Sequence, residues 1–245
     1  MHILKTTSKI ALFIALVISI TIPSTVVAQQ KQERSVKKFQ SVSLNIQGHI
    51  YLKQEANTSV VLQGDPSLLE NIETVVEGNT LKIRTKKKWG RWNRSRHGKL
   101  NIYLSTPVIE GLKISGSGSI TALTPITSAN ATCSISGSGK IIIDQIKAQQ
   151  VTCTISGSGD IQLKGQSKSI VKARISGSGN INTAKLITEK GSVHIAGSGD
   201  CRIYASKHLE ARVSGSGDIY YYGKPSIDAK TAGSGNIKCM SINND

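Results

Sequence analysis

The segment with the strongest chemical character lies between residues 84 and 99, where basic side chains alternate with aromatic ones and both tryptophans of the protein occur. Guanidinium and ammonium groups neutralise negative charge, and indole rings stack on sugars or bases or lie at a lipid interface. The segment is therefore a candidate binding loop for an anionic polymer. Its candidate contacts are Lys86, Lys87, Lys88, Trp89, Arg91, Trp92, Arg94 and Arg96. The same pattern also fits a solvated hairpin loop whose tryptophans fold back over the end of the core.

Four cysteines form the second chemical group. An even number in an exported chain is compatible with disulfides. Each cysteine, however, stands where Ile, Ala or Val stands in other copies of a repeat, so each also fits the role of a small core hydrophobe. Cys133 and Cys153 occupy the same repeat position in successive units, which would place their Cα atoms ~4.8 Å apart. A disulfide allows that distance, so Cys133 and Cys153 are a candidate pair, with free thiols as the alternative.

Carboxylates offer little for catalysis. Asp160, Asp200 and Asp218 share one repeat position, but their units are not all adjacent, and Lys140 stands at the same position in another unit. Enzymes that cleave polysaccharides need a carboxylate cluster on one face, and calcium-binding nonapeptide repeats carry Asp in nearly every copy. The sequence predicts no catalytic residue, no metal site and no cofactor. An enzyme acting on an acidic polysaccharide is the alternative class.

A repeat positions these residues. Gly-Ser-Gly begins seven times between Gly116 and Gly233, at intervals of 18 to 21 residues, which is typical of stacked-repeat proteins. Apolar residues alternate with polar ones on both sides of each Gly-Ser-Gly, which predicts strand, turn and strand with one buried face. The turn needs glycine for positive φ or for close backbone approach between coils. The corner glycines are Gly116, Gly118, Gly137, Gly139, Gly157, Gly159, Gly177, Gly179, Gly197, Gly199, Gly215, Gly217, Gly233 and Gly235.

A unit of about 20 residues cannot bury its apolar face alone, whereas units stacked at ~4.8 Å per step build a continuous core. The sequence therefore predicts an all-β fold, a parallel β-helix or closely related β-solenoid with 18 to 21 residues per coil. We expect regular coils over residues 113–240. The Asp or Asn that follows most corners is expected to adopt the left-handed conformation or to hydrogen-bond to nearby backbone.

Residues 39–112 are expected to form a degenerate β part. Phe39 to Leu52 resembles a degenerate copy of the repeated coil, and Ser59 to Gly64 is a second candidate coil. Asp65 followed by Pro66 predicts the start of one short helix. Gly78 and Asn79 predict a hairpin. Residues 29–38 are polar and are expected to be a flexible lead-in.

Residues 1–28 have the layout of a secretory signal peptide, with Lys5 and Lys9 before an apolar run and small residues before Gln29. A membrane anchor is the alternative, but the run is short for a span and Pro23 interrupts it. Cleavage would leave a mature chain without a transmembrane span. We expect that chain to be exported: to stay in the periplasm, to associate with the outer membrane or to be secreted. The formal net charge of +16 favours anionic partners. We expect an anionic glycan, lipopolysaccharide or an envelope protein rather than nucleic acid.

The Ile-Ser-Gly-Ser-Gly-Asp/Asn-Ile units, together with Leu100 to Pro107 and the hairpin from Gly78 to Ile83, resemble the putative auto-transporter adhesin, head GIN domain family of exported Bacteroidetes-type proteins. The resemblance covers about Phe39 to Lys238. It implies a right-handed β-helix, a location outside the cytoplasm and an adhesin-type role without catalytic residues. The leading hypothesis is a non-enzymatic, exported adhesin or envelope interaction module. A self-associating envelope scaffold that pairs through open solenoid ends is a further alternative.

Overall fold

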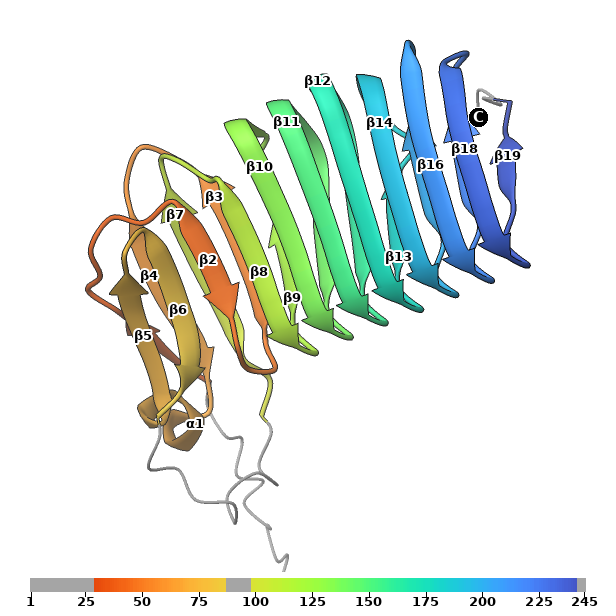
Figure 1. Ribbon diagram of the computed structural model, residues 1–245. Helices are drawn as coiled ribbons and strands as arrows, with labels where there is room; N and C mark the ends of the chain where they lie inside the picture. Colours follow the sequence, from red (N-terminus) through yellow and green to blue (C-terminus); the bar gives the residue numbers. More distant parts are fainter. Residues whose placement is uncertain (1–28, 87–97, 242–245) are drawn as a thin grey trace, which may run out of the picture.

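The computed structural model describes residues 29–86 and 98–241, and the predicted signal peptide over residues 1–28 lies outside them. These residues form one elongated β-solenoid whose coils stack along a single axis (Figure 1). Helix α1 (Pro66–Glu70) is the one helix in this part of the chain. The strands of the first half are β1 (Gln30–Glu33), β2 (Ser41–Leu44), β3 (His49–Gln54), β4 (Ser59–Gly64), β5 (Ile72–Glu77), β6 (Thr80–Thr85), β7 (Asn101–Thr106), β8 (Gly111–Gly116) and β9 (Ser119–Ala122). The strands of the second half are β10 (Ile126–Gly137), β11 (Lys140–Gly157), β12 (Asp160–Gly177), β13 (Asn180–Thr183), β14 (Leu186–Gly197), β15 (Cys201–Tyr204), β16 (His208–Gly215), β17 (Ile219–Tyr222), β18 (Ser226–Gly233) and β19 (Ile237–Cys239).

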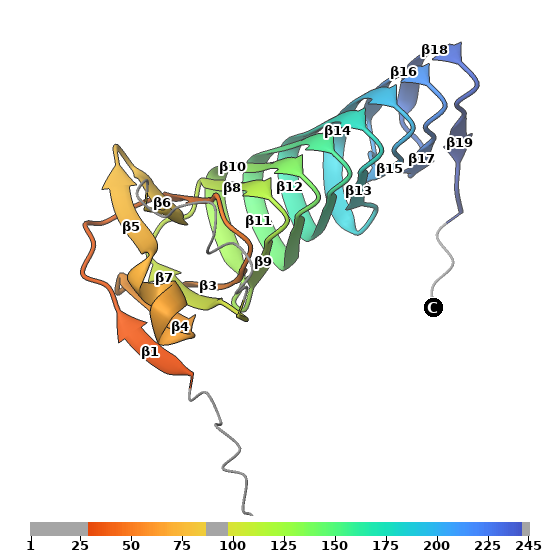
Figure 2. The ribbon, with the colours of Figure 1, turned by 90° about the horizontal axis from the view of Figure 1, so that it is seen from below.

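Each regular coil supplies strands to two facing layers (Figure 2). The first layer runs β6, β2, β8, β10, β11, β12, β14, β16, β18, with every neighbouring pair parallel. The second layer runs β7, β3, β9, β11, β12, β13, β15, β17, β19 in the same way. Strands β11 and β12 are long enough to bend from one layer into the other. In Figure 1 the front strands run downward, the return strands lie behind them, and each coil is displaced toward the C-terminal end, so the predicted right-handed solenoid is confirmed.

Aligned aliphatic columns fill the space between the layers. Ile135, Ile155, Ile175 and Ile195 are register partners on successive strands, and each is at most 3% exposed. Because every coil adds one branched side chain to each column, each coil buries the apolar face of the coil before it. The predicted alternation of buried and exposed residues on both sides of the corners is confirmed.

The corner glycines serve the two purposes expected of them: positive φ at the first glycine, and close approach between coils at the second and, from Gly137 onward, at the first as well. The first glycine of each Gly-Ser-Gly has a positive φ, for example 130° at Gly157. The second approaches the neighbouring coil closely, because a methyl group at Gly159 would stand 2.6 Å from the carbonyl oxygen of Gly139. One part of the corner prediction was wrong: no described residue other than glycine has a positive φ, so the Asp and Asn residues do not adopt the left-handed conformation.

The first half of the chain folds largely as expected. Strands β2 and β3 form a coil in parallel register with β8 and β9. Asp65 caps α1 by accepting a hydrogen bond from the Ser67 backbone N–H at 2.8 Å. Gly78, with φ 59°, turns the antiparallel hairpin of β5 and β6.

Two expectations for this half were wrong. Ser59 to Gly64 is not a second coil, because β4 runs antiparallel to β7 and closes the end of the second layer. The lead-in is not flexible throughout, because Gln30–Glu33 form β1, which pairs antiparallel with β4. The edge of β4 that does not face β7 offers backbone N–H and C=O groups to β1. These hydrogen bonds explain why a polar segment forms a strand here.

The two ends of the solenoid differ as a result. Strands β1 and β4, helix α1 and the hairpin of β5 and β6 close the N-terminal end, where Leu69 and Ile72 are buried. At the C-terminal end every residue of β18 is exposed. Within residues 29–86 and 98–241, no helix has the length and apolar character that a membrane crossing requires.

Candidate functional site

The predicted basic loop joins β6 to β7, so it connects the same two layers that the Gly-Ser-Gly corners connect in later coils. Of its candidate contacts, Lys86 alone is described: it is exposed, and its backbone N–H donates to the Asn71 carbonyl at 2.9 Å. The others lie outside the described residues, namely Lys87, Lys88, Trp89, Arg91, Trp92, Arg94 and Arg96. The basic loop stays a prediction.

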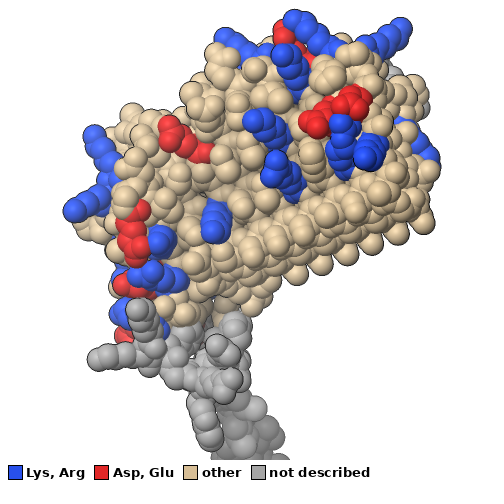
Figure 3. All heavy atoms as spheres, in the orientation of Figure 1, with Lys and Arg blue, Asp and Glu red and all other residues tan. Residues whose placement is uncertain are grey.

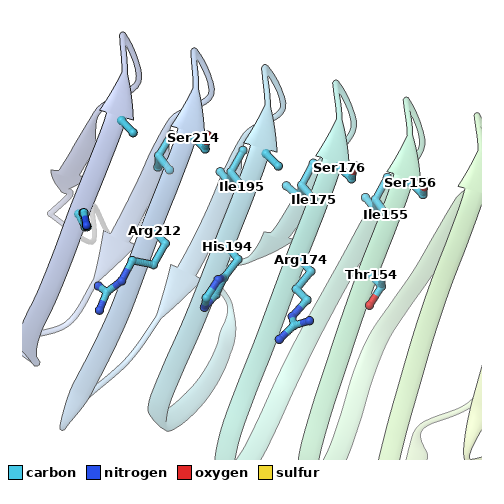
Figure 4. A pocket seen from close by; sticks show the side chains of 14 residues that line it. Thr154, Ile155, Ser156, Arg174, Ile175, Ser176, His194, Ile195, Arg212 and Ser214 are labelled. Carbon is cyan, nitrogen blue, oxygen red and sulfur yellow. The ribbon is translucent and has the colours of Figure 1, made fainter.

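A groove of about 590 Å³ crosses the outer face of the first layer, over β11, β12, β14, β16 and β18. Its long axis runs across the strands, along the stacking direction of the coils. On β12, β14 and β16 the groove lies over three consecutive positions: a long polar residue, a core residue, and a serine or alanine. Strand β11 contributes Thr154, Ile155 and Ser156, and β18 contributes Lys230 and Ala232. The long side chains form one wall, and the serine and alanine positions line the other side (Figure 4).

The wall of the groove is a basic ladder. Arg174, His194, Arg212 and Lys230 are register partners on four consecutive strands. Parallel strands lie ~4.8 Å apart, so the ladder presents a cationic or hydrogen-bonding group at each step. Figure 4 shows Arg174, His194 and Arg212 on the same face of successive strands. The sequence analysis missed this ladder, although its signal is present: these four residues stand three positions before the first glycine of their corners.

The ladder is only partly neutralised within the protein. Arg212 pairs closely with the Asp228 carboxylate, donates to the Asp228 carbonyl at 2.7 Å, and lies 3.7 Å from the Glu210 carboxylate. His194 also lies 3.7 Å from Glu210. Arg174 and Lys230 form no ion pair with any residue in the described ranges, and both are exposed. The ladder therefore has unpaired positive charge at Arg174 and Lys230, whereas Arg212 between them lies beside two carboxylates.

The surface around the groove extends this charge. Lys172 and Lys190 are exposed on the same face, beside the ladder. Figure 3 shows basic side chains spread over this face, with few acidic ones, whereas the lower edge formed by the corners is a row of uncharged atoms. A second, smaller hollow of about 340 Å³ lies on the same face over β2, β6, β8 and β10, and it includes Lys82 and Lys113.

The acidic column at the corners has a structural role. Its side chains link successive coils: Asn180 Nδ2 donates to Asp160 at 3.1 Å, and the Asp218 backbone N–H donates to Asp200 at 3.0 Å. The carboxylates thus satisfy the polar groups of the neighbouring corner. In residues 29–86 and 98–241, no group of His, Cys, Asp and Glu is arranged to hold a metal ion.

Asp218 gives this column a testable pH dependence. Its carboxylate accepts hydrogen bonds from the Asn236 side chain at 3.0 Å, the Asn236 backbone N–H at 2.7 Å and the Tyr220 hydroxyl at 2.9 Å, and these bonds lower the pKa of Asp218. Because the folded pKa lies below the unfolded one, the stabilisation is complete above pH ~4 and is lost as the pH falls through the folded value. We expect Asp218→Asn to lower Tm at pH 6 and to show a smaller deficit near pH 2.

Thermal melting at both pH values checks this expectation. Asp144→Asn is the matched control. Asp144 lies outside the acidic column, and its described ion pair, with Lys164 at 2.6 Å, lies on the exposed surface. Such exposed pairs contribute ~0–1 kcal/mol, so this variant should change Tm little at either pH. A Tm deficit of Asp218→Asn that is equally large at both pH values would contradict the assignment.

The structure also places the cysteines. Cys133 and Cys153 are direct register partners in the core, as predicted, and both are free thiols in this structure. The disulfide between them stays a prediction. Burial raises the pKa of Cys133 and Cys201 to about 12, and that of Cys153 well above its ordinary value. Cys239, on the last strand, is exposed. The three buried thiols act as small core hydrophobes.

Comparisons with known proteins agree with this architecture. The chain matches the model of the family described as putative auto-transporter adhesin, head GIN domain, over residues 38–225. A crystal structure of a putative adhesin from Bacteroides fragilis is 25% identical, with a TM-score of 0.79, and the match covers 87% of this chain and 97% of that one.

Two proteins from Parabacteroides distasonis share the fold at lower identity. A putative lipid binding protein is 23% identical with a TM-score of 0.72, over 86% of this chain and 96% of its own. A putative adhesin is 19% identical with a TM-score of 0.70, over 87% and 97% of the two chains. None of the proteins with curated descriptions matches the chain. Since the family model spans more than half of the sequence, the protein belongs to the putative auto-transporter adhesin, head GIN domain family.

Proposed function

We propose that this protein is an exported, non-enzymatic adhesin-type module that binds an anionic glycan along the groove on the first layer. The observation that carries the proposal is the ladder of Arg174, His194, Arg212 and Lys230, one group per coil across β12, β14, β16 and β18. A polymer with regularly spaced negative charges can contact such a ladder at several points at once. Many weak contacts then add up to useful affinity.

The chemistry of the groove suits a hydroxylated, charged chain. Ser156, Ser176 and Ser214 line the side opposite the ladder and can donate or accept hydrogen bonds. Arg174 and Lys230 are free to pair with carboxylate, sulfate or phosphate groups, and arginine can do so with two parallel hydrogen bonds. Because the site is open and its charges are exposed, we expect binding to weaken as salt is added.

The carboxylates of the groove favour a binding role over catalysis. General acid and base work on a glycosidic bond needs two carboxyl groups free to exchange protons with the substrate. Glu210 accepts a hydrogen bond from Ser192 at 3.0 Å and lies near His194 and Arg212. Asp228 is held by Arg212. Both acids are thus occupied in balancing the ladder, which supports the non-enzymatic proposal over a polysaccharide-cleaving enzyme.

Export is part of the proposal. It is supported by the family to which the chain belongs and by the signal-peptide layout of residues 1–28. Periplasm, outer membrane and medium are all compatible with a glycan ligand. Lipopolysaccharide, a glycolipid whose sugars carry anionic groups, is one candidate ligand in the cell envelope.

The experiment that tests this function measures binding of the protein to neutral glycans, anionic glycans, lipopolysaccharide and anionic lipid vesicles at two salt concentrations. In the groove variant, Arg174→Ser is combined with Lys230→Ser. Each lost contact with an exposed charge is worth ~0.2–1 kcal/mol, so we expect a roughly tenfold loss of affinity when several ligand repeats are engaged. The effect should be largest for anionic glycans at low salt.

The matched control combines Lys140→Ser with Lys185→Ser, two exposed lysines outside the groove, and removes the same net charge. Equal losses in both variants would mean that only overall charge matters, and would overturn the groove as the site. A third variant, with Lys86, Lys87, Lys88, Arg91 and Arg94 changed to Ser, tests the basic loop separately. Binding to vesicles without binding to glycans would favour a lipid partner instead.

A further inference from the structure

The last coil of the solenoid exposes the same positions that earlier coils bury. Ile227 on β18 is 40% exposed, whereas its register partner Leu209 on β16 is fully buried. Ala229 and Thr231 continue the inner columns of Ala211 and Val213, and both are exposed. Within the described ranges, β18 pairs with β16 alone. An edge strand with free backbone groups and apolar side chains is a template for pairing with another chain.

The opposite end of the solenoid offers no matching surface. Strands β1 and β4 run antiparallel across it, and α1 and the hairpin of β5 and β6 cover the core. A head-to-tail stack of copies would therefore bring an open edge against a closed cap. Contact between two C-terminal ends is the remaining arrangement, and two identical surfaces meet about a two-fold axis.

A two-fold axis requires the β18 strands of the two copies to run antiparallel. Side chains on a strand alternate between faces, so the inner faces of both copies point into one core only in registers that pair inner residues with inner residues. One such register is centred on Ala229. It places Ile227 opposite Thr231 of the second copy on the inner face.

On the outer face, the same register places Asp228 opposite Lys230 of the second copy, and Lys230 opposite its Asp228. The sequence Asp228-Ala229-Lys230 is thus complementary to itself when reversed. Opposite charges directly across an antiparallel pair stabilise it, and like charges destabilise it. Lysine on an edge strand ordinarily discourages pairing, but here each lysine meets an aspartate.

We propose that the protein forms a two-fold dimer in which the β18 strands of two copies pair antiparallel about Ala229. Arg212 holds the Asp228 carboxylate in place, yet that side chain is still 60% exposed and can accept a second cation. Lys230 pairs with no described residue of its own chain. The dimer joins two solenoids end to end and presents two grooves, so a long polymer can bind both at once.

Sedimentation equilibrium of the protein without any ligand tests the dimer. The wild type should reach twice the mass of one chain as its concentration rises. Lys230→Asp and Asp228→Lys each place like charges opposite each other at two points, so each should weaken self-association at least ~10-fold. Lys140→Asp, far from β18, is the control and should dimerise like the wild type.

Mixing the two variants gives the sharper result. A copy with Asp at both positions is complementary to a copy with Lys at both positions, so the mixture should regain dimer mass that neither variant shows alone. Circular dichroism confirms that each variant is folded. A wild type that stays monomeric at every concentration, or folded variants that do not complement each other, would overturn the proposal. Because no glycan is present, either outcome concerns the dimer alone. Arg174→Ser by itself leaves β18 unchanged, so its effect on glycan binding tests the proposed function separately.

Discussion

Gly157→Ala should lower the free energy of unfolding by about 4 kcal/mol, because two costs coincide at this corner. Gly157 has φ 130°, a conformation that residues with a Cβ rarely adopt. A methyl group there would also stand 2.5 Å from the carbonyl oxygen of Gly137 in the preceding coil. That oxygen cannot retreat easily, since it accepts a hydrogen bond from the Ser158 N–H at 2.9 Å.

Two other corner glycines separate the costs. Gly116 has φ 124° but no atom within 4 Å of an added methyl group, so Gly116→Ala should show strain alone, about 2 kcal/mol. Gly159 has no positive φ, but its methyl group would lie 2.6 Å from both the Gly139 carbonyl oxygen and Ile135 Cγ2. Gly159→Ala should therefore show overpacking alone, about 2 kcal/mol.

Urea unfolding followed by circular dichroism, with thermal melting as a second probe, measures all three variants. The loss at Gly157 should be close to the sum of the losses at Gly116 and Gly159. Equal losses at Gly157 and Gly116 would show that the coils can separate at the corner without cost, which would contradict tight stacking there. Because such corners fix the register between successive coils, disrupting one corner should destabilise the coils on both sides of it.

Only one of the four thiols should react quickly with a thiol reagent under native conditions. Cys239 is exposed, whereas Cys133, Cys153 and Cys201 are buried with raised pKa values. The thiolate is the reactive form, and the pKa of about 12 for Cys133 and Cys201 leaves very little of it at pH 8. The buried thiols should react at least ~100-fold more slowly than Cys239, at a rate set by opening of the fold.

The same titration decides the state of Cys133 and Cys153. In denaturant without reductant, four reactive thiols per chain would match the free cysteines of the structure, whereas two would reveal the disulfide. Cys239→Ser is the control, because it should remove the fast phase and leave the slow one unchanged. Fast reaction of more than one thiol in the native protein would contradict the burial of the core column.

The sequence by itself determined the repeating part of the fold. The interval between corners, the alternation around them and the paired glycines predict stacked coils, aligned aliphatic columns and tight turns, because each depends on local geometry repeated many times. The α1 cap at Asp65 and the hairpin at Gly78 were likewise predictable, since both are set by a few neighbouring residues. Strand β4 was not, because alternating hydrophobicity is the same whether a strand pairs parallel or antiparallel.

Only the tertiary structure decided where the candidate site lies. Successive coils differ in length, yet regular pairing over the last residues before each corner keeps Arg174, His194, Arg212 and Lys230 in register. Irregularities such as the shift between Ser167 and Ile170 are confined to the bend away from the corners. The ladder is thus made by pairing between strands 18 to 20 residues apart. Local sequence pattern fixes which face a side chain occupies, but stacking decides which side chains become neighbours.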